Sequence, residues 1–135
     1  MNSSLGFKDE PELINWLIQS CGHEKFTPGL DKINQAVTPY LKKFKQTKII
    51  TVAGTNGKGQ TSYFLEEILS SHGSVAMWTS PHIHSVRERF RLNKVLISEN
   101  KLLNICADLR SKELNLSYYE FLFAAFIILA SEQQI

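Results

Sequence analysis

Two apolar runs dominate the pattern of hydrophobic and polar positions along the chain. The first, from Lys48 to Ala53, contains isoleucine, threonine and valine and is typical of a parallel strand covered on both faces. The second, from Phe121 to Ala130, is ten residues long, whereas a bilayer span needs about 20. We therefore expect a central strand and a buried helix in the core of one domain.

Apolar residues at helical spacing, bounded by capping residues, predict several helices. The first has Asp9 as its cap, with Glu12 reaching back to it, and ends at Gly22. The second follows Gly29-Leu-Asp31 and is expected to restart at Thr38-Pro39. The other expected segments are a polar loop from His23 to Pro28 and helices from Lys58 to His72, from Ser98 to Lys112, and from Ser117, where Ser117-Tyr-Tyr-Glu120 is a capping box.

A second strand is expected from Ser74 to Thr79. With the first strand and the helix between them it would form a right-handed βαβ unit. Ligands bind beyond the carboxyl ends of parallel strands, so Thr79-Ser-Pro-His82 is expected beside the turn that follows Ala53. Farther along, arginines alternate with other residues from Arg87 to Leu92, as in a half-exposed strand. Arg87, Arg89 and Arg91 could bind an anion together or simply face solvent.

The turn between the central strand and the next helix has the composition of a phosphate-binding loop. Gly54, Gly57 and Gly59 lack a Cβ atom, so the backbone can adopt positive φ and bring N–H groups close to an anion. The helix that begins near Lys58 adds unpaired N–H groups and the positive end of its dipole. Lys58 supplies a full positive charge for phosphate oxygens. An ordinary strand-to-helix corner would need only one glycine.

The turn departs from the common phosphate-binding loop at the residue after its lysine. The common loop has serine or threonine there, whose hydroxyl binds Mg²⁺, whereas this chain has Gly59. Val52 also stands where the common loop has its first glycine. The magnesium ligand must then come from elsewhere, and Ser80 or Thr79 is the candidate. The plain alternative for Ser80 is a turn residue before proline.

Composition favours a single folded domain, with 43% apolar and 21% charged residues. The net charge of +2 is too small to indicate nucleic acid or a membrane surface as partner. Cys21 and Cys106 lack metal-binding spacing and are expected to be reduced packing residues. His82 and His84 make only a weak metal pair. Residues Met1 to Phe7 lack the features of a signal peptide, so we expect a cytoplasmic protein.

Four segments carry a resemblance to a known family. They are Gly54-Thr-Asn-Gly-Lys-Gly59, Thr79-Ser-Pro-His82, Glu88-Arg-Phe-Arg91 followed by Ile97-Ser98, and Leu116-Ser-Tyr-Tyr-Glu-Phe121. Their order and approximate spacing resemble bifunctional dihydrofolate synthase/folylpolyglutamate synthases of the Mur ligase superfamily. Gly29-Leu-Asp-Lys-Ile33 is similar to that family's N-terminal pterin-side motif. The resemblance therefore covers the chain from about Gly29 to its last residue.

The resemblance implies an α/β fold, with a P-loop-type parallel sheet and flanking helices that is incomplete in this chain. It implies an ATP-dependent ligase that adds L-glutamate to dihydropteroate or to a folylpolyglutamate through an acyl phosphate. ATP and Mg²⁺ would be the cofactors. Dihydropteroate or folate, L-glutamate and ATP would be the small-molecule partners, and neither nucleic acid nor a membrane is expected.

The family's functional positions transfer residue by residue. Lys58 would be the catalytic residue and Ser80 the magnesium ligand. Capping and core packing explain Tyr119 and Phe121 equally well, and Gln60 departs from the family's usual serine or threonine. The nucleotide would be bound by Gly54, Thr55, Asn56, Gly57, Lys58, Gly59, Gln60 and Thr61, and the substrate by Gly29, Leu30, Asp31, His82, Tyr118, Tyr119, Glu120 and Phe121.

The resemblance also predicts that residues 1–135 are the N-terminal portion of the ATP-binding domain, inactive alone. In the family, Ile135 would be followed by the next core strand, and the C-terminal glutamate-ligase domain would come later. We therefore expect the final helix to be partly exposed and to promote self-association. One alternative is another P-loop protein, such as a small kinase or GTPase, although the chain has no Asn-Lys-x-Asp motif. Another is a non-catalytic interaction remnant.

Overall fold

The computed structural model describes residues 6–23, 29–133 and 135. The polar loop expected from His23 to Pro28 lies outside the described residues, except for His23 itself. Within the described part, no helix is long and apolar enough to cross a membrane. The elements are α1 (Glu10–Cys21), α2 (Asp31–Leu41), η1 (Lys42–Phe44), α3 (Lys58–Leu69), β1 (Ala76–Trp78), η2 (Val86–Arg89), β2 (Phe90–Leu92), β3 (Val95–Leu96), α4 (Glu99–Arg110) and α5 (Tyr118–Ser131).

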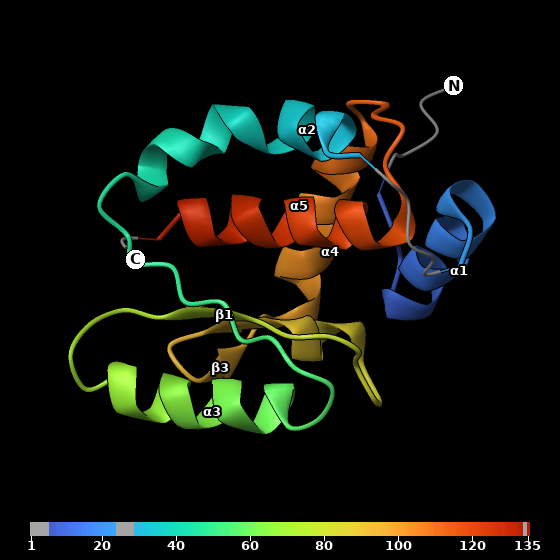
Figure 1. The fold of residues 1–135 in the computed structure, drawn as a ribbon. Helices are drawn as coiled ribbons and strands as arrows, with labels where there is room; N and C mark the ends of the chain where they lie inside the picture. Colours follow the sequence, from blue (N-terminus) through green and yellow to red (C-terminus); the bar gives the residue numbers. More distant parts are fainter. Residues whose placement is uncertain (1–5, 24–28, 134) are drawn as a thin grey trace.

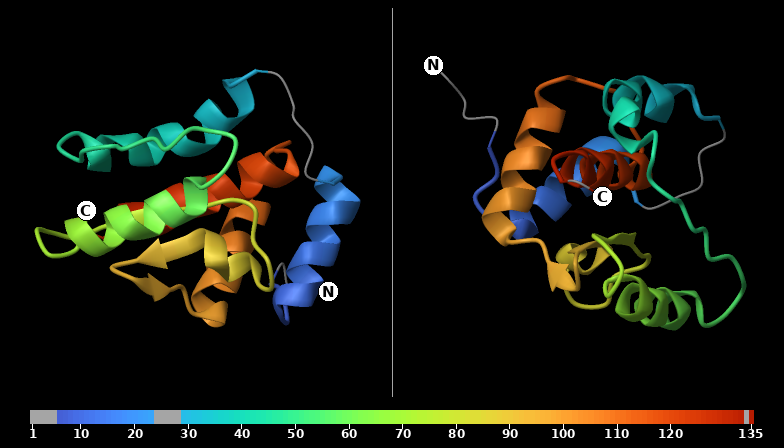
Figure 2. Two further views of the ribbon diagram at one scale, coloured as in Figure 1. Left: turned by 60° about the horizontal axis from the view of Figure 1, so that its bottom comes forward. Right: turned by 90° about the vertical axis from the view of Figure 1, so that its left-hand side faces the viewer.

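The elements are stacked with α5 near the middle. Figure 1 shows α2 on one side of α5 and the small sheet on the other, with α3 beyond the sheet. The right-hand view of Figure 2 shows the same order. Figure 1 also shows that α2, α3 and α5 all begin at one end of the molecule, where β1 ends. The segments that the sequence associated with nucleotide and substrate therefore share one end of the fold.

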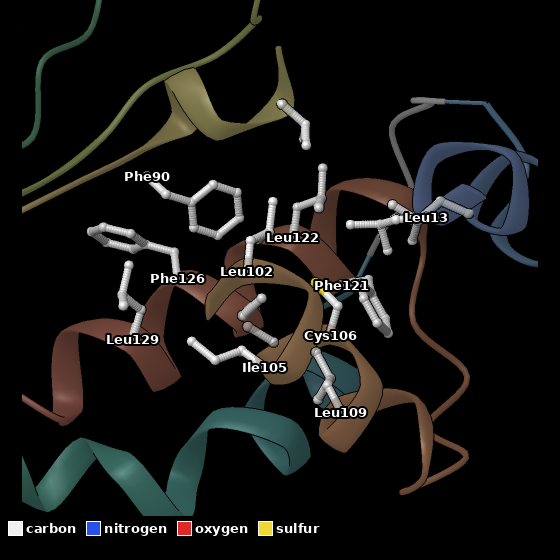
Figure 3. Close-up of a cluster of buried hydrophobic side chains, with 14 of the residues drawn as sticks. Leu13, Phe90, Leu102, Ile105, Cys106, Leu109, Phe121, Leu122, Phe126 and Leu129 are labelled. Carbon is white, nitrogen blue, oxygen red and sulfur yellow. The ribbon is translucent and has the colours of Figure 1, made fainter. Parts of the chain in front are cut away.

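The hydrophobic core joins α1, α4, α5 and the start of β2. Figure 3 shows Leu13, Phe90, Leu102 and Leu122, which come from these four elements, within one cluster of apolar side chains. Each of these four residues is 0% exposed. Burial of the larger cluster to which they belong supplies the main apolar stabilisation of the fold.

Most of helix α5 is buried, and the partial exposure expected of it is limited to Tyr119, which is 37% exposed, and to Phe123, Ile127 and Ile128, which are partly buried. It packs against α2, α4, α1 and β1. These elements cover much of the surface that strands following Ile135 were expected to cover. The self-association expected through this helix stays a prediction. The buried residues of α5 are Tyr118, Phe121, Leu122, Ala124, Ala125, Phe126, Leu129, Ala130 and Ser131.

The described sheet is antiparallel and has the order β1-β2-β3. Met77 of β1 lies opposite Arg91 of β2. The strand expected from Ser74 to Thr79 is confirmed as the shorter β1. The α/β class with flanking helices is also confirmed, but the parallel βαβ pair is not formed among the described residues. The central strand expected from Lys48 to Ala53 is also absent, since these described residues form no strand.

The segment from Lys48 to Ala53 is a coil that runs outside the packed elements (Figure 2). Ile49 is 81% exposed and Ile50 is 55% exposed. A β-branched apolar run gains its preference for a strand from pairing and packing against neighbours. Among the described strands none pairs with this segment, so the strand expected there does not form.

The capping residues expected for α1, α4 and α5 are confirmed. Asp9 caps α1 by accepting a hydrogen bond from the N–H of Glu12, at 2.9 Å. Ser98 caps α4, and Ser117 and Glu120 form the expected capping box of α5. These bonds satisfy N–H groups that have no partner inside their helix.

Helix α2 is continuous, so the restart expected at Thr38-Pro39 is wrong. The Thr38 hydroxyl donates to the carbonyl of Asn34 at 2.6 Å instead of capping a new helix. Pro39 lies near the carboxyl end of α2, where its missing N–H affects only the last turn.

The three arginines do not form the row expected along a strand. Arg87 and Arg89 belong to η2, and only Arg91 lies in β2. Arg89 is 1% exposed and donates from Nε to Nδ1 of His82 at 2.9 Å. Arg87 donates to a backbone carbonyl, and Arg91 donates to Glu66. Internal contacts therefore replace both the anion-binding row and the solvated face that the alternation suggested.

Candidate functional site

The glycine-rich turn forms the start of α3, as the sequence predicts. Gly57 is the residue before the helix and has φ 78°, in the left-handed region that glycine occupies without strain. Gly54 also has a positive φ, whereas Gly59 lies inside the first turn of α3. A Cβ added at Gly57 would meet nothing within 4 Å, so its conformation, rather than crowding, favours glycine there.

The N-terminus of α3 carries unpaired donors. No side chain caps this helix, and the first backbone bond that closes it runs from the N–H of Thr61 to the carbonyl of Gly57, at 2.9 Å. The N–H groups of the first helical residues therefore point out of the helix end, where an anion can accept them. Gln60 and Thr61 are exposed there, as are Thr55 and Asn56 in the turn.

The Lys58 ammonium folds back over the turn. Its Nζ donates to the carbonyl of Gly54 at 2.8 Å and to the carbonyl of Thr55 at 3.2 Å. The side chain is exposed, and these two acceptors are neutral. A phosphate oxygen would offer a stronger, charge-assisted acceptor, so the ammonium can turn from the carbonyls to a bound phosphate.

The two hydroxyls considered for magnesium differ in their surroundings. Thr79 donates from Oγ1 to the carbonyl of Glu88 at 3.2 Å, which links the end of β1 to η2. Ser80, the next residue, has an exposed side chain. Ser80 is therefore the more available of the two. Across the described ranges, no group of three or more His, Cys, Asp or Glu side chains could hold a metal ion.

The residues associated with the substrate lie at the starts of α2 and α5. Gly29, Leu30 and Asp31 are exposed at the start of α2. Tyr119 is 37% exposed, and its hydroxyl accepts a hydrogen bond from Nε1 of Trp78 at 2.9 Å. Figure 1 shows these two helix ends on the same side of the molecule as the start of α3.

The neighbours of Tyr119 have structural roles. Phe121 is 2% exposed, and its ring lies 5.1 Å from that of Trp16 in an edge-on contact. The Glu120 carboxylate accepts from the N–H and hydroxyl of Ser117, at 2.9 and 2.8 Å. Tyr118 is also buried. Of this group, Tyr119 is the residue that offers an exposed aromatic surface.

His82 lies in a loop that Glu88 organises, a role that the sequence analysis missed. The Glu88 carboxylate accepts from the N–H groups of Ile83, His84 and Ser85, at 2.7 to 3.0 Å. These bonds lower the pKa of Glu88 to about 2, because they favour its charged form. The spacing of Ser85 and Glu88, a capping box, was the signal that could have revealed it.

The same loop borders a shallow hollow of about 550 Å³ beside α1. His82, His84 and Ser85 line one side. Glu10 lines the other, and its carboxylate accepts from the N–H of Val86 at 2.6 Å and from the hydroxyl of Ser85 at 2.9 Å. Both carboxylate oxygens therefore serve to hold α1 against the loop.

Comparison with known proteins decides between the candidate families. A folylpolyglutamate synthase from Arabidopsis thaliana is 44% identical over 107 residues, which are 72% of this chain and 17% of the relative. A dihydrofolate synthase/folylpolyglutamate synthase from Haemophilus influenzae is 32% identical over 123 residues, 88% of this chain and 28% of the relative. This chain is related to the folylpolyglutamate synthases. No protein-family model matches it.

Solved structures support the same relationship. The crystal structure of folylpolyglutamate synthase from Thermotoga maritima matches with a TM-score of 0.78 and 27% identity, over 93% of this chain and 31% of that one. A bifunctional folylpolyglutamate synthase/dihydrofolate synthase from Yersinia pestis, complexed with AMPPNP and Mn ion, matches with a TM-score of 0.79 and 27% identity, over 98% and 32%. E. coli FolC in complex with DHPP and ADP also has a TM-score of 0.79.

The family resemblance identified in the sequence is thereby confirmed, as is the Mur-ligase-like fold. The chain spans 17% of the Arabidopsis relative and about a third of the length of the matched structures. The activity of the whole relatives is therefore a proposal for this chain.

Proposed function

We propose that this chain supplies the nucleotide-phosphate-binding part of an ATP-dependent ligase that adds L-glutamate to dihydropteroate or to a folylpolyglutamate. The turn from Gly54 to Thr61 carries the proposal. It combines left-handed Gly57, the open N–H groups of α3 and the Lys58 ammonium at one exposed helix end. These are the groups that recognise phosphate by backbone donors and by charge.

Such a ligase joins a carboxylate of the pteroate or folate to the amine of glutamate through an acyl phosphate, with ATP as the phosphoryl donor. The protein's task in this chemistry is to position the phosphates and neutralise their charge. Lys58 and the N–H groups of α3 would orient the phosphates. Tyr119 and the start of α2, at the same end of the fold, would lie toward the pterin.

A magnesium ion fits this end of the fold as a phosphate-bound cation with few protein ligands. Mg²⁺ in nucleotide sites keeps several waters and is bound mainly through phosphate oxygens and one or two protein groups. Ser80, exposed at the end of β1, would supply the hydroxyl that Gly59 lacks. A Yersinia relative was solved with AMPPNP and Mn ion, which agrees with a divalent cation.

The test is a calorimetric titration of the whole chain with ADP and magnesium, using Lys58→Ala and Lys43→Ala as a matched pair. Both lysines are exposed, but Lys43 lies in η1, away from the turn. Loss of a charge-assisted bond costs about 1.5 to 3 kcal/mol, so Lys58→Ala should weaken binding about 10- to 100-fold. Lys43→Ala should bind as the unmodified chain does. Equal affinity for all three proteins, or a preference for GDP over ADP, would refute the proposal.

A further inference from the structure

Helix α3 is attached to the fold in an unusual way. Its apolar residues Phe64 and Ile68 are 70% and 61% exposed. The one buried residue of α3 is Glu66, which is 2% exposed. A buried carboxylate is costly unless ion pairing and hydrogen bonds compensate it, so its partners identify what holds this helix.

The partners of Glu66 lie on the β2-β3 hairpin. Oε2 accepts from Nε of Arg91 at 2.8 Å, and Oε1 accepts from the N–H of Lys94 at 2.9 Å. The Arg91 guanidinium also lies 4.9 Å from the ring centroid of Tyr63, one turn earlier on α3. The side chain of Arg91 is 16% exposed, so solvent screens the pair only weakly.

The hairpin side of this contact is itself held in place. Asn93 and Lys94 have φ of 50° and 70°, which places both turn residues in the left-handed region. The N–H of Asn93 donates to the carbonyl of Val75 at 2.8 Å, and its side-chain oxygen accepts from the N–H of Val75 at 2.7 Å. Arg91 donates to the carbonyl of Lys94 at 2.7 Å. Glu66 therefore binds to a hairpin that is fixed to the start of β1.

The contact of Glu66 with Arg91 and Lys94 lies about two turns, or about 12 Å, along α3 from Lys58. A tilt of the helix about this point by about 10° would move its first turn by about 2 Å, and misplacement of a binding group by about 1 Å can cost about 100-fold in function. Building on the function proposed above, we propose that the buried ion pair of Glu66 with Arg91 is a positioning clamp, which sets where the phosphate-binding end of α3 lies relative to the end of β1.

Three variants of the whole chain test the clamp. Glu66→Gln removes the charge at nearly constant shape, and Arg91→Lys keeps the charge but loses the stacking and the fixed geometry. The matched control is Glu67→Gln, the neighbouring residue on α3, whose carboxylate pairs with Lys94 at 2.6 Å on the surface. Exposed pairs contribute little, so this control should leave α3 in place. Circular dichroism at 15 °C verifies that each protein is folded.

The first measurement is amide hydrogen exchange, which does not depend on nucleotide. In both clamp variants, exchange within α3 should be at least about tenfold faster, while α4 and α5 keep their protection. The second is titration with inorganic pyrophosphate and magnesium, where both clamp variants should bind at least about tenfold more weakly and Glu67→Gln within about twofold.

Unchanged exchange in α3 of a folded clamp variant would overturn the clamp, as would unchanged pyrophosphate affinity. A loss of protection in every helix alike would also overturn it, because it would indicate a general stabilising role. If the unmodified chain bound no pyrophosphate while α3 alone loosened in the variants, the function proposed for the turn would fail and the attachment of α3 by Glu66 would stand.

Discussion

Replacement of Leu122 by alanine tests the placement of α5 at the centre of the fold. Leu122 is 0% exposed and lies in the same core cluster as Leu102 and Phe90 (Figure 3). The change removes three carbon atoms, which at about 0.8 kcal/mol per buried methylene amounts to about 2.4 kcal/mol. The cavity left behind adds to this, so we expect the free energy of unfolding to fall by about 3 to 4 kcal/mol.

Urea unfolding followed by circular dichroism provides the assay, with Ile68→Ala as the control. Ile68 has the same number of carbon atoms but lies on α3, where it is 61% exposed, so its replacement should change the free energy of unfolding by less than about 0.5 kcal/mol. A loss below about 1 kcal/mol at Leu122, or equal losses at both positions, would refute the buried position of α5.

Three further predictions concern capping, pH and the thiols. Ser117→Ala removes the cap of α5 and should lower the free energy of unfolding by about 1 kcal/mol in the same urea assay; no change would contradict it. The pKa of Glu88 is lowered to about 2 by the N–H groups of residues 83–85, so its contribution to stability is complete above its ordinary pKa of 4.5 and is lost as the pH falls toward 2. Urea midpoints should therefore fall less between pH 5 and 2 in Glu88→Gln, and parallel pH profiles would refute this. Burial raises the pKa of both thiols, but Cys106 is 0% exposed whereas Cys21 is half-buried. A thiol reagent should label Cys21 first and Cys106 only on unfolding, with equal rates as the contradicting result.

Local signals in the sequence predicted local structure well. Asp9, Ser98 and Ser117 are helix caps in the structure, because a cap depends on bonds within one turn of chain. The glycine turn before α3 was also predictable, since the left-handed conformation of Gly57 is a local property. This turn is the part of the candidate site that we propose binds phosphate.

Features that depend on distant partners were not predictable in the same way. The apolar run from Lys48 to Ala53 has strand composition, yet strand structure needs a neighbour to pair with, and the described sheet consists of β1, β2 and β3. Helix α5 was expected to be partly exposed because the family's next core strand would follow Ile135, whereas in the structure α2 and α4 pack against it.

Buried polar contacts were the least visible in the sequence. The alternation of arginines from Arg87 to Arg91 resembles a strand face, but each guanidinium has a specific internal partner. Glu66 gives no signal of burial, because its partner Arg91 lies 25 residues away. Its contact with the hairpin emerges only when the chain is folded.

The most direct test of the central claim is a two-dimensional amide NMR titration of the chain with ADP and magnesium. If the turn binds phosphate, the amide signals of Gly54, Gly57 and Gly59 should show saturable shifts, with the largest changes at the start of α3, and these shifts should be lost in Lys58→Ala. Absence of shifts at these glycines, or saturable shifts confined to other elements, would contradict the assignment of this turn as the phosphate-binding site.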